Sequence, residues 1–368
     1  MAESDRKLKL HRNRIDRIDA DILRLMHDRL TIARSIAEVK ETLNEPAYYR
    51  PEREAQILAR LHELNHELEN GENSGLLDDQ SLTSLFREIL SITRSMEAAL
   101  SVSVLGPPGT YTEAAARHHF GSTIGVVDFP TIAEVFKATE AGQTDFAVVP
   151  IENSTEGGVS GTLDRLVTTP LTICSEINLR ILHNLLGKGT SSDPVTKVYA
   201  HVQSLGQCQR WLHRHCPHAE LVPVSSNAEA ARIASEGDGV AAIASSTAAE
   251  RYQLNTLAAN IADEPANTTR FLVLSNRVTP PSGNDKTSLL LSCRSRPGAL
   301  LHLLSPLLDE QIDMTKIESR PSRVKLWDYL FFIDIVGHQD EEHVSRALER
   351  LKEEAGLFKN LGSYSVSQ

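Results

Sequence analysis

The chain has 368 residues, of which 40% are apolar and 24% charged, and its formal net charge is −11 at pH 7. This length predicts two or three domains, and the composition is that of an ordinary globular protein. The acidic balance argues against nucleic-acid or membrane binding, which favours basic surfaces, so an anionic ligand needs a local basic pocket. Charged residues crowd the first ten positions and no apolar run reaches about 18 residues, so we expect a cytoplasmic protein.

The first segment of the chain predicts only helices. One periodic run covers residues 6–43, a second helix runs over 51–68 from a favourable first-turn proline, and a third covers 81–100. Two polar stretches, 44–49 and 69–80, separate them.

Arg29 stands at the one position of an apolar stripe that is not apolar. The stripe follows helical spacing and predicts a face that packs against other helices: Ile15, Ile18, Ile22, Leu25, Ile32, Ile36, Val39. A guanidinium desolvated there costs on the order of several kcal/mol unless an anion meets it. The alternative is an arginine whose long side chain reaches the helix edge. We interpret Arg29 as part of an anion-binding pocket in a helical bundle.

Two further cations extend this pocket. Lys40 lies 11 residues after Arg29 on nearly the same face, about 16 Å along the helix. Arg12 lies 28 residues before Lys40, roughly 42 Å away, so both cannot bind one small ligand from one chain. If Arg12 contributes, an antiparallel partner helix must supply it, which predicts a dimer with shared sites.

The order and spacing of six charged residues resemble the all-helical chorismate mutases: Arg12, Arg29, Lys40, Arg53, Glu54, Glu97. The resemblance implies that the three arginines bind the two carboxylates of chorismate, with Arg12 coming from the partner chain. It implies that Lys40 and Glu97 face the ether oxygen and that Glu54 faces the ring hydroxyl. Catalysis would then be conformational restraint and electrostatic stabilisation without a nucleophile.

Three positions depart from that pattern. Glu97 stands where glutamine is frequent, and a carboxyl group can donate a hydrogen bond only when it is protonated. Arg50 stands near the place of an acidic residue, and Thr93 replaces a smaller, serine-like substrate contact.

The second segment, residues 101–278, alternates strands and helices and contains an internal echo. Ala133 and Ala228 each begin a helix that leads into a buried strand, at an offset of 95 residues. Two similar α/β lobes predict a cleft between them, although any two βα units share this pattern.

Three polar clusters follow predicted strands of this segment, at 106–113, 150–158 and 267–271. Threonine and serine at such junctions are often simple helix caps. Thr269-Arg270-Phe271, Glu152-Asn153-Ser154 and the stretch 201–208 resemble prephenate dehydratases, with Val202 in place of a usual proline.

That resemblance implies loss of carbon dioxide and water from prephenate, giving phenylpyruvate. We assign the acid role to Thr269 and the carboxylate clamp chiefly to Arg270. The other predicted substrate contacts are Thr110, Glu152, Asn153 and Ser154.

Neither a metal nor a cofactor is predicted. His213, His215 and His218 surround Cys216, but the group follows an amphipathic helix and no second ligand pair is present, so we interpret it as a solvated helix end. No Cys-x-x-Cys pair occurs, and we expect free thiols in a reducing compartment: Cys174, Cys208, Cys216, Cys293.

After a linker at 277–285, the last segment predicts the order β-α-β-β-α-β of a ferredoxin-like sandwich. The expected elements are 287–293, 297–309, 313–319, 327–336, 341–354 and a strand near Tyr364. The turn from Arg296 through Gly298, Ala299 and Leu300, and the strand end Glu318-Ser319-Arg320-Pro321, resemble regulatory ACT domains. Alone, either is an ordinary helix start or strand end. The resemblance implies phenylalanine binding at a dimer interface and feedback inhibition.

Together these patterns resemble bifunctional chorismate mutase–prephenate dehydratases of phenylalanine biosynthesis. We predict a three-helix mutase domain at 1–100, a two-lobed α/β dehydratase domain like periplasmic binding proteins at 101–279, and an ACT domain at 286–368. The expected ligands are chorismate, prephenate and phenylalanine, and the expected assembly is a homodimer or higher homo-oligomer. The alternatives are an arogenate dehydratase and a non-catalytic two-lobed sensor.

Overall fold

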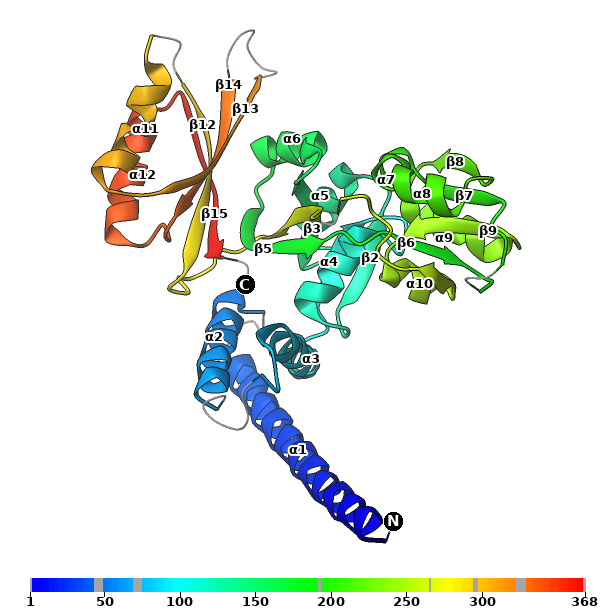
Figure 1. The fold of residues 1–368 in the computed structure, drawn as a ribbon. Helices are drawn as coiled ribbons and strands as arrows, with labels where there is room; N and C mark the ends of the chain where they lie inside the picture. Colours follow the sequence, from blue (N-terminus) through cyan, green and yellow to red (C-terminus); the bar gives the residue numbers. More distant parts are fainter. Residues whose placement is uncertain are drawn as a thin grey trace.

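The computed structural model describes residues 2–42, 49–68, 75–190, 193–264, 266–293, 297–321 and 329–366. Three regions follow one another in chain order, and Figure 1 shows a helical region, a two-lobed α/β region and a separate sheet with two helices. The predicted break at 44–49 lies almost wholly outside the described residues, as do Arg296 and the start of the strand predicted at 327.

Three helices form the N-terminal region, as predicted: α1 (Ala2–Thr42), α2 (Pro51–Leu68) and α3 (Asp79–Glu97). The Asp78 carboxylate caps α3 by accepting the backbone N–H of Ser81 at 2.8 Å. The third helix packs against both others, while most of α1 extends away from the molecule (Figure 1). The apolar stripe of α1 is therefore exposed in the single chain, at 55% for Ile18 and 67% for Leu25.

The first lobe of the central region is a mixed sheet in the order β2-β1-β3-β11-β5, with β4 paired to β3. Its inner strands are buried on both faces, as Val102, Val148 and Val149 are fully covered. Its elements are β1 (Ser101–Leu105), α4 (Tyr111–Phe120), β2 (Gly125–Phe129), α5 (Ile132–Glu140), β3 (Phe146–Asn153), β4 (Gly157–Gly158), α6 (Ser160–Thr168), β5 (Thr172–Arg180) and β11 (Thr268–Ser275).

A second sheet, in the order β10-β6-β9-β7-β8, forms the other lobe and confirms the predicted two-lobed architecture. The chain enters this lobe after β5 and returns to the first lobe at β11, so β11 is contributed by the last part of the region. Its elements are β6 (Asn184–Gly187), β7 (Lys197–His201), α7 (Val202–Gln207), α8 (Gln209–His215), β8 (Glu220–Val224), α9 (Asn227–Glu236), β9 (Val240–Ala244), α10 (Ser246–Tyr252) and β10 (Asn255–Ala258).

The C-terminal region is the predicted ferredoxin-like sandwich, with a sheet in the order β13-β14-β12-β15 and two helices on one face (Figure 1). Its elements are β12 (Asp285–Ser292), α11 (Ala299–Asp309), β13 (Met314–Pro321), β14 (Tyr329–Val336), α12 (Glu342–Glu354) and β15 (Leu357–Ser365).

The two faces of this C-terminal sheet pack against different partners. Leu289 and Leu291 join the core under α11 and α12, whereas Leu290 between them joins the core of the first central lobe. Strand β15 crosses β5 so closely that a Cβ at Gly362 would lie 2.3 Å from the carbonyl oxygen of Ile173. The C-terminal sheet and the sheet of the first central lobe therefore share a packed interface.

Across the described ranges, none of the helices combines the length and apolar character that crossing a membrane requires.

Candidate active sites

The predicted mutase residues of α1 and α3 lie face to face. Lys40 Nζ donates to Glu97 Oε2 at 2.8 Å, and both side chains are only 17% exposed. Arg29 Nη1 donates to the Thr93 hydroxyl, which in turn donates to the carbonyl of Ile89 at 2.7 Å. Burial lowers the pKa of Arg29, which marks the desolvation expected for a guanidinium within the bundle.

Glu54 belongs to the same neighbourhood but has a partner that the sequence did not reveal. Both carboxylate oxygens accept from Arg94 Nη1, at 2.8 and 3.1 Å, and Arg94 also donates to the carbonyl of Phe120. Burial raises the pKa of Glu54 to about 7. A buried carboxylate is stable only beside a cation, so Glu54 faces Arg94 where a ring hydroxyl was expected. Arg94 follows Thr93 directly in α3, one helical turn before Glu97. This spacing from two predicted pocket residues is the one sequence signal that points to Arg94.

Two predicted mutase residues do not join this group. The side chain of Arg53 on α2 is exposed, and Arg12 is exposed on the outer part of α1. The single chain thus brings together Arg29, Lys40, Glu54, Thr93 and Glu97 and leaves the other two arginines outside.

A cleft of about 550 Å³ separates the two central lobes. Both lobes contribute polar side chains to its lining, including Thr110, Asn153, Gln203, Ser226, Asn267 and Thr269. Thr110 also caps α4, because its hydroxyl donates to the carbonyl of Leu105 at 2.7 Å and accepts the N–H of Glu113. Thr110 therefore fulfils both interpretations, as a helix cap and as part of the cleft.

Thr269 and Asn153 are paired neighbours on β11 and β3 and point into this cleft together. Thr269 is 8% exposed, and its hydroxyl oxygen accepts from Asn153 Nδ2 at 2.8 Å. The same Nδ2 donates to Asn267 Oδ1 at 2.7 Å. The structure therefore brings two of the predicted site residues, Asn153 and Thr269, together in one cleft.

The polar chain continues to residues that the sequence did not single out. Asn267 Nδ2 donates to Gln207 Oε1 at 3.1 Å, and His183 Nε2 lies 2.8 Å from the same oxygen. The His183 ring also meets the Tyr111 hydroxyl, at 2.9 Å. Gln207 belongs to the stretch 201–208 noted in the sequence. Neutral amides and a lone histidine, however, form no charge pattern that would identify them as site residues from the sequence.

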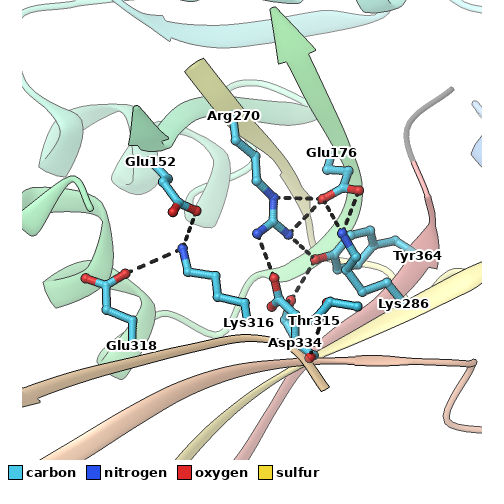
Figure 2. A network of polar contacts seen from close by, with 10 residues as sticks. Glu152, Glu176, Arg270, Lys286, Thr315, Lys316, Glu318, Asp334 and Tyr364 are labelled. Atoms are coloured by element: carbon cyan, nitrogen blue, oxygen red, sulfur yellow. Dashed lines mark hydrogen bonds and ion pairs between the residues drawn. The ribbon is translucent and has the colours of Figure 1, made fainter. Parts of the chain in front are cut away.

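Arg270 points toward Asp334 and Tyr364 of the C-terminal sheet (Figure 2), whereas Thr269 lines the cleft, which contradicts the predicted role of Arg270 as the carboxylate clamp. Its guanidinium donates to Glu176 at 2.7 Å, to Asp334 at 2.6 Å and to the Tyr364 hydroxyl at 2.9 Å. Successive strand residues alternate between faces, so the neighbour of a cleft residue points toward the C-terminal sheet. Two protein carboxylates already neutralise this arginine.

Glu152 is displaced from the cleft for the same reason. Its carboxylate accepts from Lys316 of β13 at 2.5 Å, and Lys316 also lies 3.5 Å from Glu318 (Figure 2). Ser154, the third residue of the motif, accepts the backbone N–H of Thr268 at 3.0 Å and does not line the cleft. The predictions of Glu152 and Ser154 as substrate contacts are therefore corrected, because both serve as structural links.

The predicted regulatory residues occupy the expected elements. Gly298, with φ +74°, precedes α11, which begins with Ala299 and Leu300. On β13, Arg320 donates to the carbonyl of Ser160 at 3.0 Å, and the Glu318 carboxylate lies against Gly158. Gly158 of β4 lines the cleft, so β13 touches a strand that forms part of one wall of the central site. The remaining two, Ser319 and Pro321, complete the end of the strand.

The described ranges contain no cluster of three or more His, Cys, Asp or Glu residues that could hold a metal ion. All four cysteines are free, and burial raises the pKa of the Cys174 and Cys208 thiols to about 12. Such thiols are protonated at neutral pH and are poor nucleophiles.

Family profiles match the three regions in order. The chorismate mutase type II profile matches residues 11–98, the prephenate dehydratase profile 102–279 and the ACT domain profile 287–353. The molecule is thus an enzyme with two separate catalytic regions followed by a regulatory-type domain.

Relatives and a solved structure extend the comparison. A bifunctional chorismate mutase/prephenate dehydratase of Neisseria gonorrhoeae is 50% identical over 366 residues, covering 99% of this chain and 98% of the relative. One of Pseudomonas aeruginosa is 47% identical, covering 99% of each. A crystal structure of prephenate dehydratase from Arthrobacter aurescens in complex with L-Phe has a TM-score of 0.67 and 34% identity, covering 73% of this chain and 90% of that one.

The chain belongs to the family of bifunctional chorismate mutase/prephenate dehydratases. It rearranges chorismate to prephenate and converts prephenate to phenylpyruvate.

Proposed function

We propose that the mutase reaction takes place between α1 and α3, with Arg29 and Lys40 binding the substrate. Arg29 contacts a neutral hydroxyl, so its positive charge is available to a substrate carboxylate, and Lys40 is paired with the single carboxylate of Glu97. Chorismate carries two carboxylates, and the pocket provides the cations to hold them while the ether bond breaks. Glu97 beside Lys40 then faces the ether oxygen, Glu54 stays with Arg94, and Arg53 closes the pocket from α2.

A second copy of the chain completes this site in our proposal. The stripe of α1 leaves Ile18 and Leu25 more than half exposed, and a contiguous apolar helix face of this kind requires a cover. Antiparallel pairing of two α1 helices covers both stripes and brings Arg12 of one copy toward Lys40 of the other. We therefore propose a homodimer with two shared mutase sites, which is also the repeating unit of any higher homo-oligomer.

In the central cleft, we propose that Thr269 assists departure of the prephenate hydroxyl. The bond to the ring carboxylate breaks and releases carbon dioxide, and its electron pair makes the ring aromatic as the C–O bond breaks. The departing oxygen takes up a proton and leaves as water. Thr269 donates to that oxygen and regains a proton from solvent.

The substrate carboxylates need a binding partner other than Arg270. Five of the described helices begin at the cleft wall, after Thr110, Val159, His201, Ser226 and Ser245. Backbone N–H groups at helix N-termini attract anions, and α4 and α9 are the longest of these helices. We propose that these helix ends hold the carboxylates.

Replacing Thr269 tests this assignment. Thr269→Ala is expected to abolish formation of phenylpyruvate, followed by its ultraviolet absorbance, while chorismate consumption continues unchanged. A variant that keeps most dehydratase turnover would remove Thr269 from the proposed role.

We propose that phenylalanine binds the C-terminal domain near Gly298, Ala299, Leu300 and the strand end Glu318–Pro321, and that it inhibits the dehydratase. The L-Phe complex of the Arthrobacter dehydratase supports this ligand. The charged contacts of Figure 2 supply a route, because Lys316 and Asp334 of the C-terminal sheet hold Glu152 and Arg270, the chain neighbours of Asn153 and Thr269. Inhibition requires that phenylalanine bind two arrangements of this interface differently.

Two variants test the regulation. Ser319→Ala is expected to lose inhibition by phenylalanine, and Lys316→Met to weaken it at least about fivefold, the lower range of allosteric coupling. Arg346→Gln is the matched control, because Arg346 forms a surface ion pair with Glu310 within the same domain. Unchanged inhibition in both test variants would contradict the proposal.

Prephenate rather than arogenate is the proposed substrate of the cleft, and turnover of the two acids by the same preparation decides this. The domain boundaries 1–100, 101–279 and 286–368 and a cytoplasmic location complete the proposal.

A further inference from the structure

The hydrogen bonds around Thr269 have a direction that the backbone determines. Asn153 Oδ1 accepts the backbone N–H groups of Thr155 at 3.0 Å and Glu156 at 3.2 Å. A backbone N–H is only a donor, so the side-chain atom that faces these two groups must be the amide oxygen. The orientation of the Asn153 amide is therefore fixed.

The NH₂ group of Asn153 consequently faces Thr269 and Asn267. It lies 2.8 Å from the Thr269 hydroxyl oxygen and 2.7 Å from Asn267 Oδ1. An amide NH₂ donates and does not accept, so the Thr269 oxygen must accept here. The single hydrogen of that hydroxyl is then free to point elsewhere, and Thr269 lines the cleft.

A second anchor lies across the cleft. Gln207 Oε1, at the end of α7 in the other lobe, accepts from Asn267 Nδ2 at 3.1 Å and lies 2.8 Å from His183 Nε2. Burial lowers the pKa of His183, so its ring is neutral and carries its one hydrogen on the nitrogen that faces this acceptor. The other ring nitrogen lies 2.9 Å from the Tyr111 hydroxyl, whose single hydrogen also has the carbonyl oxygen of Leu182 at 2.9 Å as an acceptor. The bonds from Asn153 through Asn267 to Gln207 run in one consistent direction.

We infer that Asn153 is a positioning residue that makes the Thr269 hydroxyl an obligate donor toward the departing hydroxyl of the substrate. Asn267, Gln207 and His183 hold that orientation from both lobes. The inference rests on the proposed role of Thr269 and adds what the motif left open, namely the groups that help a weakly acidic hydroxyl to donate.

The variant Asn153→Asp reverses the direction with almost no change in shape. One carboxylate oxygen still accepts from Thr155 and Glu156, but the other now accepts where the NH₂ group donated. Thr269 must then donate to this introduced carboxylate, and its hydrogen is withdrawn from the cleft. We expect kcat for prephenate to fall at least about 100-fold at pH 8, the range for loss of one oriented donor, with a much smaller change in KM.

Lowering the pH should restore dehydratase activity to Asn153→Asp, because the introduced carboxyl group can donate a hydrogen bond once it is protonated. The ratio of variant to native kcat is therefore expected to rise as pH falls. The titratable groups that line the same cleft are Tyr111, Glu156, His183 and His201, and they are present in both proteins, so the ratio cancels their contribution.

Asn255→Asp is the matched control, because the Asn255 side chain lies on β10 and donates to the carbonyls of Lys188 and Gly189, outside the cleft. Its ratio to the native enzyme should stay flat with pH. Mutase turnover of each preparation reports that the chain is folded.

A second pair of variants tests the far anchor independently. Gln207→Glu keeps an acceptor for Asn267 and His183, whereas Gln207→Met has similar size and none. We expect Gln207→Glu to keep at least about tenfold more dehydratase kcat than Gln207→Met, as one lost hydrogen bond predicts. Equal losses in the two would mean that only side-chain volume matters.

The outcomes separate this inference from the proposed function. If Thr269→Ala stays active, the proposed role of Thr269 fails. If Thr269→Ala is inactive but the Asn153→Asp ratio does not change with pH and the two Gln207 variants are equal, the role of Thr269 stands and the positioning network is overturned.

Discussion

The two catalytic regions of this chain approach anionic substrates in opposite ways. The mutase region places the long cations Arg29 and Lys40 on one helix, α1, where they contact Thr93 and Glu97 of α3, and leaves the surrounding apolar stripe uncovered. The dehydratase region encloses its cleft between two lobes of one chain and lines it with hydroxyls, amides and helix ends. Arg270, the arginine of its Thr-Arg-Phe motif, instead forms an ion pair with Asp334 of the C-terminal sheet. In our proposal the helical site takes Arg12 from a partner chain, whereas both lobes that line the cleft belong to one chain.

Separate substitutions in the two regions should give the largest effects. Arg29→Ala removes a half-buried cation and should lower mutase kcat/KM at least about 100-fold, as expected for one oriented charged donor. Dehydratase turnover of added prephenate should not change. Thr269→Ala should give the reverse pattern, and a variant of either kind that impairs both reactions would contradict the separation.

The pH profile of the mutase offers a sharper comparison. Glu97 must be protonated to donate to the ether oxygen, so mutase activity should fall as pH rises. Glu97→Gln provides a permanent donor and should flatten the profile. Initial rates of chorismate loss across pH for the two proteins measure this, and identical profiles would remove Glu97 from the role.

Glu54 predicts a smaller effect, on stability. The folded protein keeps the Glu54 proton up to about pH 7, whereas a carboxyl of ordinary pKa 4.5 loses it much earlier. Between these pH values the folded state binds more protons than the unfolded state. The contribution of Glu54 to stability therefore falls as pH rises through this interval. Glu54→Gln should therefore lose less unfolding free energy than the native chain between pH 5 and about 7. Urea unfolding at both pH values measures the difference, which vanishes if Arg94 keeps Glu54 ionised throughout.

Much of the fold followed from sequence periodicity. The 3.6-residue stripe of α1, the alternation of strands and helices in the centre and the β-α-β-β-α-β order at the end all correspond to observed elements. These patterns reflect burial, which local sequence records directly.

The side-chain assignments were predicted less completely, for a geometric reason. The motif Thr269-Arg270 identifies a strand end, but only the packed sheets determine that Thr269 faces the cleft and Arg270 faces Asp334. In the same way, Glu152 faces Lys316 of the C-terminal sheet, whereas its neighbour Asn153 faces the cleft. Gln207 and His183 lie far from these motifs in sequence, and a chain of neutral groups leaves no periodic signal.

Subunit mixing tests the shared mutase site most directly. Arg12→Ala and Lys40→Ala are each prepared as inactive mutases, mixed, and allowed to exchange subunits. If each site takes Arg12 from one copy and Lys40 from the other, mixed dimers hold one intact site of two, and the mixture regains about one quarter of native mutase activity. The dehydratase variants Thr269→Ala and Gln207→Met, mixed in the same way, should regain nothing. A mutase mixture that stays as inactive as its components would contradict the shared site.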